Sequence, residues 1–228
     1  MYCKYSFYTL SMQIWESYYR CVTKRVAEEA KRPYELGKRL DQMEQSRAAI
    51  LRAARAQLEA NGYRQFTMAS LAAESGVTRQ TIHNLFGTKT AVLEALFDVI
   101  ALDGGMERMR EAMTQPSGKA MLEQFVKIFC GFWAINRVLF RRIHGIGAID
   151  PEFGTVIEAR NRRRLMAATR IVRKMSVGQE VEQRAAVLAA LTSFEFFDAL
   201  AASCGGEREV EAILLELAQN ALSASFKR

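Results

Sequence analysis

The positions of its three prolines constrain the fold of this 228-residue chain more than any other sequence feature. Proline disrupts the interior of a helix, but it is accepted in the first turn and just beyond the end. Pro33, Pro116 and Pro151 leave long segments without proline, and within these segments apolar residues recur every three or four positions. No segment alternates apolar and polar residues over a length that predicts a strand. We therefore expect an all-α fold.

Glycine-containing segments are expected to separate the helices. A long first helix begins near residue 35 and ends at Asn61-Gly62, because asparagine and glycine favour a helix end. Further breaks are expected at Gly104-Gly105, 145–151, 176–178 and Gly205-Gly206, with His144 in a turn. Apart from the motif described below, later helices are expected over Thr88–Leu102, Ser117–Asn136, Glu152–Met175, Gln179–Ser203 and Glu207–Ser223.

Composition excludes several classes of protein. Half of the residues are apolar and a quarter are charged, which is typical of a globular chain and not of a disordered one. Apolar runs such as residues 128–135 are far shorter than the roughly 18 residues that cross a membrane. Cys3, Cys21, Cys130 and Cys204 lack the spacing of a disulfide framework or of a zinc site. We expect a cytoplasmic protein with reduced thiols and with no membrane segment, metal or cofactor.

The net charge of +7 is concentrated in the first two fifths of the chain. Residues 1–92 contain 14 Lys or Arg and 8 Asp or Glu, whereas residues 93–228 contain 18 and 17. This asymmetry indicates a polyanionic partner for the N-terminal part, although a solvated basic surface would give the same count.

Residues 1–34 are expected to be an extension of the folded chain. The first 23 residues contain 7 of the 22 aromatic residues without a regular period, and polar residues interrupt any apolar run that would form a secretory signal. A disordered tail accounts for this composition, as does a misassigned start codon with initiation near Met12 or Met43. An ordered extension is the alternative.

Residues 67–86 (TMASLAAESGVTRQTIHNLF) predict a helix-turn-helix. Thr67 is a suitable N-cap for the first helix, and Gly76 stands where a left-handed backbone ends it. Thr78 is expected to cap the second helix, whose apolar face contains Ile82. Side chains suited to base edges and phosphates follow Thr78, namely Arg79, Gln80, Thr81, His83 and Asn84, and Lys89 then places a cation beside free N–H groups of the next helix.

These features resemble the TetR family of transcriptional regulators, through the stretch AAILRAARAQLEANGYRQFTMASLAAESGVTRQTIHNLFGTKTAVLEALF. The resemblance covers about Ser46 to Gly104, and beyond it only the number and lengths of the helices agree. It implies an N-terminal three-helix DNA-binding domain over residues 35–92 and a larger C-terminal effector-binding and dimerisation domain over residues 93–228. It also implies a sequence-specific homodimeric repressor that a ligand releases from a near-palindromic double-stranded DNA operator.

The resemblance implies roles for individual side chains of the motif. His83 stands where the family most often has tyrosine, and Leu85 where histidine or tyrosine is common, so the bases that are read cannot be copied from relatives. A histidine still donates to phosphate, and a solvent-facing position without a contact is the alternative. Phosphate contacts are implied for Thr67, Thr78 and Lys89, and contacts with bases or neighbouring phosphates for Arg79, Gln80, Thr81 and Asn84.

A candidate effector site follows from the helix expected at 117–136. Its residues Phe125, Phe129 and Phe132 form an apolar stripe, which is either plain core or, as the resemblance implies, the wall of a small-molecule cavity. On the helix expected at 152–175, a helical projection directs Asn161 and Arg164 inward. A buried guanidinium needs a partner, so Arg164 either pairs with a structural carboxylate or anchors an acidic or polar ligand. His144 has a similar but weaker claim.

The last two expected helices, at about 179–203 and 207–223, are apolar on more than one side. Two such helices from each of two copies form a four-helix bundle that covers the excess apolar surface. A homodimer of this kind is also what the resemblance implies, and it would place two recognition helices in successive major grooves.

Other functions are weighed against this one. An activator of the same fold is one alternative, and a helical small-molecule or lipid-binding scaffold without DNA binding is another. An enzyme is not expected, because the sequence contains no HExxH, Walker A or GxSxG motif and has only two histidines, which are far apart.

Overall fold

The computed structural model describes residues 33–60, 66–175 and 180–223, and every regular element within these ranges is helical. The expectations for the extension at 1–34, for Asn61-Gly62 and for the break at 176–178 fall wholly or largely outside the described residues. The chain divides into two compact units, residues 1–45 and 46–228. Of the first unit, the structure describes only the N-terminal part of one helix.

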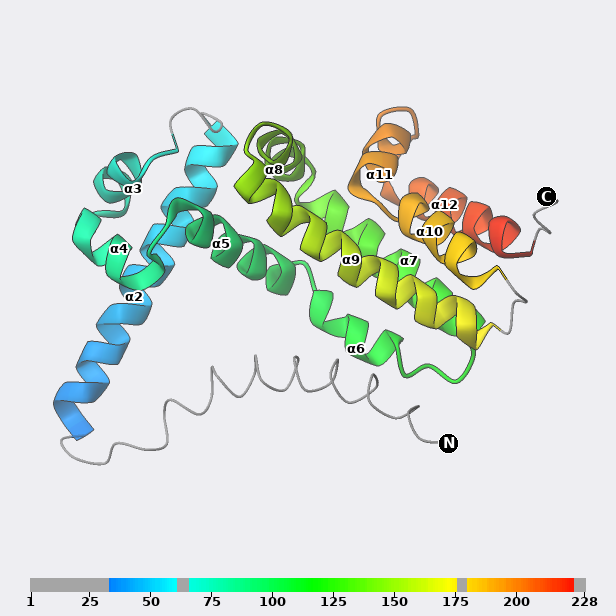
Figure 1. Cartoon of the computed structure of the whole chain (residues 1–228), viewed down its shortest axis with the longest axis horizontal. Helices are drawn as coiled ribbons and strands as arrows, with labels where there is room; N and C mark the ends of the chain where they lie inside the picture. The colour runs from blue at the N-terminus through cyan, green and yellow to red at the C-terminus, as the bar shows by residue number, and fades with distance from the viewer. Residues whose placement is uncertain (1–32, 61–65, 176–179, 224–228) are drawn as a thin grey trace, which may run out of the picture. The chain divides into compact units, whose positions relative to one another are not determined.

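The described helices are shown in Figure 1. They are α2 (Pro33–Ala60), α3 (Met68–Ser75), α4 (Arg79–Phe86), α5 (Lys89–Asp103), the 3-10 turn η2 (Met106–Arg108), α6 (Met109–Ala112), α7 (Gly118–Ile135), α8 (Arg137–Ile149), α9 (Pro151–Lys174), α10 (Val181–Leu191), α11 (Phe194–Ala201) and α12 (Glu207–Ser223). The all-α prediction is therefore confirmed for the described part of the chain.

Several helix ends lie where local sequence signals place them. Pro33 and Pro151 are the first residues of α2 and α9. The hydroxyl of Ser117, which follows Pro116, accepts a hydrogen bond of 3.1 Å from the backbone N–H of Ala120 and caps α7. These are short-range contacts, which explains why the sequence alone locates them.

The predicted turn at His144 is wrong, because α8 continues through Ile149. The break predicted at 145–151 is present but consists of Asp150 alone, between α8 and α9. Gly147, one of the glycines that suggested a longer break, is a packing position. A Cβ at Gly147 would meet the side chain of Ile157, and a Cβ at Gly154 would lie 2.9 Å from the carbonyl oxygen of Gly147. The two glycines therefore let α8 and α9 approach each other closely.

The single helix predicted at 179–203 is instead two helices, α10 and α11. Ser193 caps α11 by accepting a hydrogen bond of 3.2 Å from the N–H of Phe196. The indole N–H of Trp133 donates to the carbonyl oxygen of Thr192 at 3.0 Å, which satisfies a backbone group at the break. A buried side chain from α7 thus stabilises an interruption that helix propensity does not indicate.

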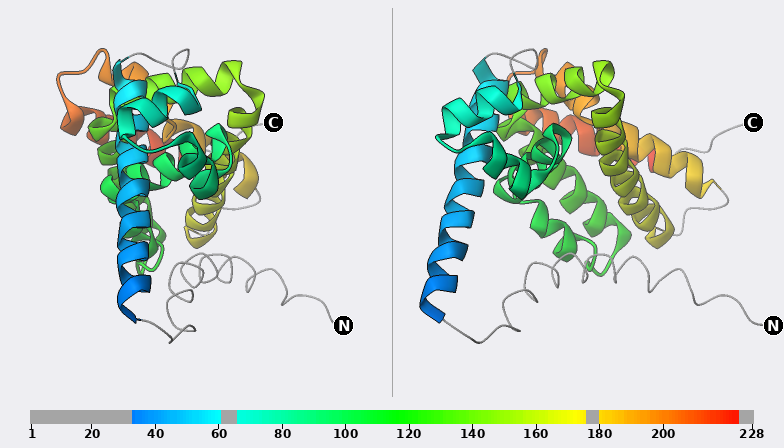
Figure 2. Two further views of the ribbon diagram at one scale, coloured as in Figure 1. Left: turned by 90° about the vertical axis from the view of Figure 1, so that its left-hand side faces the viewer. Right: turned by 60° about the vertical axis from the view of Figure 1, so that its left-hand side comes forward.

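Four helices of the second unit form a bundle. α7 packs against α9 and α12, and α10 packs against the same two helices (Figures 1 and 2). The core contains a layer of aromatic rings on α7, in which Trp133 lies with its ring centroid 4.7 Å from those of Phe132 and Phe140 and 5.6 Å from that of Phe194. Phe140 in turn lies 5.4 Å from Phe97 of α5. This aromatic layer connects α5, α7, α8 and α11.

A cluster of charged side chains joins α8 to α11. Arg137 and Arg141 both donate to the carboxylate of Asp198, at 2.5 and 2.8 Å. Burial acts to raise the pKa of Asp198, but the hydrogen bonds from the two arginines lower it below its usual value. The short helix α11 is therefore held to α8 by charge-assisted hydrogen bonds as well as by apolar contacts.

Two further findings concern chemistry rather than shape. Burial raises the pKa of the Cys130 thiol to about 12, so this cysteine stays protonated and unreactive at neutral pH. No helix in the described ranges is long and apolar enough to cross a membrane.

We predict opposite effects for two Gly→Ala substitutions near the α8–α9 contact. At Gly145 the new Cβ meets nothing within 4 Å, so Gly145→Ala should stabilise the protein by roughly 0.5–1 kcal/mol through helix propensity. At Gly154 the new Cβ meets the Gly147 carbonyl, so Gly154→Ala should destabilise it by about 1–3 kcal/mol. Urea unfolding followed by circular dichroism measures both. Shifts of the same sign would contradict the packing role of Gly154.

Candidate nucleic-acid interface

The predicted helix-turn-helix begins with a capping box at the start of α3. The Thr67 hydroxyl accepts a hydrogen bond of 3.1 Å from the N–H of Ser70, and the Ser70 hydroxyl receives one of 3.0 Å from the N–H of Thr67. The Ser70 hydroxyl also donates to the side-chain oxygen of buried Gln57 at 3.0 Å. This contact fixes the start of α3 to α2.

The turn between the two helices depends on Gly76. Its φ of 69° lies in the left-handed region, where it ends α3, as predicted. Residues with a Cβ are strained in this conformation, whereas glycine is not. Val77 follows and packs against the hydrophobic core. The angle between α3 and α4 is thus set by a backbone conformation that favours glycine.

Thr78 caps α4 through a hydrogen bond of 3.1 Å from the N–H of Thr81, again as predicted. The two threonine hydroxyls lie 2.9 Å apart. On the inner face, Ile82 is fully buried, and the ring of half-buried Phe86 lies 4.8 Å beneath the guanidinium of Arg47 from α2. The cap and these apolar contacts hold α4 in a fixed rotation about its own axis.

This rotation exposes a row of polar side chains. Arg79, Gln80, His83 and Asn84 are exposed, and Thr81 is half-buried. The Gln80 amide donates to the Asn84 side-chain oxygen at 2.9 Å, so these two amides form a preorganised pair on the outer face. Asparagine and glutamine side chains bind adenine edges, and arginine binds guanine or phosphate.

The start of α5 lies directly after α4. Gly87 has a φ of 76°, and Thr88 then caps α5 by accepting a hydrogen bond of 3.0 Å from the N–H of Ala91. Half-buried Lys89 is the first helical residue. The structure therefore brings all eight predicted DNA-contact residues into one segment of three capped helix starts.

The geometry of this segment defines a class of protein. A short helix fixed by a glycine turn, with polar side chains along its outer face and a cation at the next helix start, is the arrangement of helix-turn-helix DNA-binding proteins. Leu85, which departs from the family pattern, packs inward against the core and presents no polar group.

The predicted effector residues lie on α7 and α9. Phe125, Phe129 and Phe132 are buried in the hydrophobic core. Arg164 is also buried, and its Cζ lies 5.9 Å from the centre of the Phe129 ring. Asn161 is half-buried, one turn earlier on α9. The structure thus brings Arg164 and Phe129 together, while it shows Phe125 and Phe132 as packed core residues.

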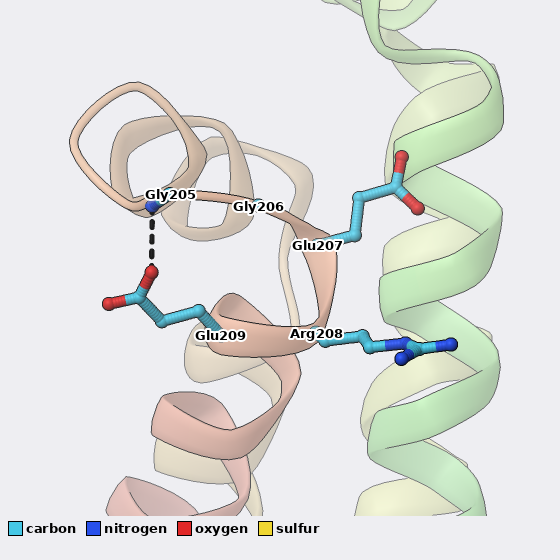
Figure 3. A pocket seen from close by; sticks show the side chains of 5 residues that line it. All are labelled: Gly205, Gly206, Glu207, Arg208 and Glu209. Carbon is cyan, nitrogen blue, oxygen red and sulfur yellow. Dashed lines mark hydrogen bonds between the residues drawn. The ribbon is translucent and has the colours of Figure 1, made fainter.

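An open hollow lies elsewhere, at the start of α12 (Figure 3). It is lined by Gly205, Gly206, Glu207, Arg208 and Glu209. The backbone N–H of Gly205 already donates to the Glu209 carboxylate at 2.7 Å, so a ligand would have to compete for it. This hollow does not coincide with the predicted effector residues.

Sequence reasoning missed the contacts that hold the helix-turn-helix to the later helices. Arg142 of α8 donates to the carbonyl oxygen of Leu58 in the last turn of α2. Arg55 of α2 donates to the Asn136 side chain at 3.1 Å. The sequence carries little signal for these arginines, because their partners are distant in sequence.

Comparisons with known proteins agree with the geometry. Residues 50–96 match a family model described as bacterial regulatory proteins, tetR family. No curated protein matches the sequence of the chain. The match spans the end of α2, the whole helix-turn-helix and half of α5.

Solved structures show the same fold at low sequence identity. A TetR-like transcriptional regulator from Rhodococcus sp. RHA1 is 20% identical with a TM-score of 0.61, covering 79% of this chain and 97% of that one. A TetR transcription regulator from Haloarcula marismortui is 16% identical with a TM-score of 0.61, covering 82% and 99%. A transcriptional regulator from Saccharomonospora viridis in complex with choline is 16% identical with a TM-score of 0.60, covering 77% and 96%.

The family model identifies the DNA-binding segment, and the solved structures share the fold over most of the chain. The chain therefore resembles the TetR family of transcriptional regulators, through the family model over residues 50–96 and through a shared fold.

We predict that Gly76 is required for the stability of the helix-turn-helix. Gly76→Ala should destabilise the protein by about 1–2 kcal/mol, because φ is positive there, and Gly76→Asn should cost less, because asparagine tolerates this region. Chemical unfolding of the wild type and of both variants measures their free energies of unfolding and so gives the order of stability. Equal stability of the glycine and alanine proteins would contradict the role assigned to the turn.

Proposed function

We propose that the chain is a homodimeric repressor, acting in the cytoplasm, whose affinity for a near-palindromic operator falls when a small molecule binds. This proposal rests on the position of α4. The helix is capped at its start and its inner face is buried, so its outer face exposes Arg79, Gln80, His83 and Asn84 together. The proposed division is a DNA-binding domain over residues 35–92 and an effector-binding and dimerisation domain over residues 93–228.

The proposed DNA contacts follow from where each group lies. Thr67, Thr78 and Lys89 are at helix starts, where backbone N–H groups and the helix dipole favour a phosphate. The outward groups of α4 are assigned to base edges or to neighbouring phosphates. In this assignment the hydrogen bond between Gln80 and Asn84 holds both side-chain amides in place before DNA binds, which reduces the conformational entropy lost on binding.

The proposed dimer interface uses α10, α11 and α12. Ala186 and Ala190 of α10 and Ala199 of α11 are exposed, and Leu217 of α12 is 38% exposed. Small side chains allow helices to approach closely, and an exposed leucine gains from being covered. A two-fold pair of these surfaces would give each operator half-site one copy of α4.

The proposed coupling between effector and operator runs through α9 and α5. Arg160 of α9 donates to the Asp98 carboxylate at 2.8 Å and to the Glu94 carbonyl oxygen at 3.3 Å, and its Cζ lies 4.2 Å from the centre of the Phe97 ring. Because Glu94, Phe97 and Asp98 are on α5, which begins at Lys89, a shift of α9 would move the start of α5. A ligand that favours the shifted form lowers operator affinity by its difference in affinity for the two forms.

A small-molecule effector is also supported by comparison. The regulator from Saccharomonospora viridis with the same fold is in complex with choline. That complex supports ligand binding by this fold, and it leaves the chemistry of the ligand of this chain to be argued from its own residues.

We predict that DNA binding depends on Arg79 and on salt. Affinity for a duplex containing the chain's own promoter region should fall as salt rises, and Arg79→Ala should weaken it about 10-fold or more. Arg163→Ala, an exposed arginine of α9, is the matched control and should bind like the wild type. Fluorescence anisotropy at several salt concentrations measures all three. A wild-type protein that does not bind at low salt would refute the proposed function.

We also predict that Leu217 contributes to dimerisation. Leu217→Glu should shift the protein towards monomer and weaken operator binding, because it places a charge in the proposed apolar interface. Leu165→Glu on α9 is the matched control, since Leu165 is 39% exposed. Sedimentation velocity separates the two species. If only Leu165→Glu produced monomers, the interface would lie on α9 instead.

A further inference from the structure

A cluster of ionisable side chains in the C-terminal helices has no part in the DNA interface. It consists of His144 on α8, Arg164 on α9 and Glu195 on α11. The His144 Nδ1 lies 2.6 Å from the Glu195 carboxylate, and this hydrogen bond chiefly lowers the pKa of Glu195 to about 2. Glu195 is therefore ionised at neutral pH and is held by His144 rather than by Arg164.

Arg164 is buried with most of its hydrogen-bonding capacity unused. Only 9% of the residue is exposed, and burial lowers the pKa of its guanidinium. Its Nε donates to the carbonyl oxygen of Ala189 at 3.1 Å. Within the described residues, no acceptor lies within hydrogen-bond distance of its two terminal amino groups, and no carboxylate forms an ion pair with it. Four N–H donors of a buried cation are thus available to a ligand.

The terminal amino groups of Arg164 are not fully enclosed. Both groups retain some contact with solvent, because among the described residues the only fully enclosed side-chain nitrogen or oxygen without a hydrogen bond is the Nε of Arg184. Asn161 lies three residues earlier, on the same face of α9, and is half-buried. In the described ranges its side-chain amide has no hydrogen-bond partner either. In the described ranges, these two neighbouring polar side chains of α9 therefore have hydrogen-bonding capacity that the protein does not use.

The chemistry of these groups favours a carboxylate. The planar guanidinium matches the two oxygens of a carboxylate, and the Asn161 amide can donate a third hydrogen bond. A phosphate dianion is less suitable, because Glu195 already offsets part of the charge of Arg164. The Phe129 ring, whose centre lies 5.9 Å from the Cζ of Arg164, makes the immediate surroundings of the guanidinium apolar.

The same surroundings disfavour a quaternary ammonium ligand. Such cations bind to open aromatic faces. Here Phe129, Phe132, Phe140 and Phe194 all lie with ring centroids within 5.7 Å of the Trp133 centroid, so these rings pack on one another. A buried guanidinium also repels a second cation.

We propose that Arg164 and Asn161 bind the carboxylate group of a small organic acid with an apolar body. The role of this acid as the effector rests on the function proposed above. The existence of the binding site does not rest on that function, because the site is defined by Arg164 and Asn161 of α9.

The test uses a thermal-shift panel of benzoate, phenylacetate and octanoate with the full chain. Benzamide, phenyl phosphate and choline serve as chemical controls. At least one carboxylate should raise the melting temperature, and benzamide, phenyl phosphate and choline should not. A panel in which no carboxylate binds, or in which choline or phenyl phosphate binds instead, overturns the proposal.

Substitutions at Arg164 and Asn161 test whether the carboxylate binds there. Arg164→Met should reduce the affinity for the active carboxylate about 10- to 100-fold, and Arg164→Lys should reduce it less, because it keeps the charge but loses the fork. Arg163→Met, on the exposed side of α9, is the matched control and should bind normally. Since Arg164→Met also leaves the Ala189 carbonyl without this donor, Asn161→Ala is a second variant that disturbs no hydrogen bond in the described residues. Undiminished binding by both Arg164→Met and Asn161→Ala would place the carboxylate elsewhere and refute the proposal.

A DNA-binding assay distinguishes this site from the proposed function. The carboxylate that raises the melting temperature should also lower the affinity of the wild type for its promoter duplex. If it binds through Arg164 but leaves DNA affinity unchanged, the site stands and ligand-released repression fails. If the protein binds no DNA while the carboxylate still binds through Arg164, the proposed function fails alone.

Discussion

The packing of aromatic rings around Trp133 is the interaction on which the arrangement of α5, α7, α8 and α11 depends. Its ring contacts rings of α7, α8 and α11, and its indole N–H donates to the carbonyl oxygen of Thr192 at the break between α10 and α11. Through Phe140 the layer reaches Phe97 on α5. A buried indole needs an acceptor, so the break between α10 and α11 and the position of α7 determine each other. Dense packing of this kind transmits displacement instead of absorbing it.

The helix-turn-helix is connected to that core by a small number of polar contacts. α2 is held at its last turn by Arg142 and near Asn136 by Arg55, and α5 is held by Arg160. Since α3 contacts α2 and α4 packs against α5, these three arginines, which lie outside α3 and α4, contribute to the orientation of the exposed side chains of α4. A charge-assisted hydrogen bond contributes roughly 1.5–3 kcal/mol, which is comparable with the coupling energies typical of ligand-controlled proteins.

Hydrogen bonds between residues close in the sequence account for the structural features that could be predicted. Thr67, Thr78, Thr88 and Ser117 cap helices through hydrogen bonds that span three residues, so their role is evident in a single chain. Gly147 and Gly154 could not be interpreted in this way, because the reason for glycine is the other helix. The break at Ser193 was not predicted, because the adjoining carbonyl of Thr192 accepts a hydrogen bond from Trp133, which is distant in the sequence. Arg164 was correctly placed inside, whereas its backbone acceptor on α10 could not be identified from periodicity.

One consequence of the α9 geometry concerns how such a protein can diversify. Arg160, which holds α5, and Arg164, which faces the interior, are one turn apart on the same helix, about 6 Å along its axis. The tight contact at Gly147 and Gly154 anchors the start of that helix to α8. In the proposed mechanism, substitutions at 161 and 164 change which molecule is bound, while the contacts of Arg160 with α5 stay unchanged. The proposed ligand contact and the proposed coupling contact are thus separate positions on one helix, so selection can act on either of them alone.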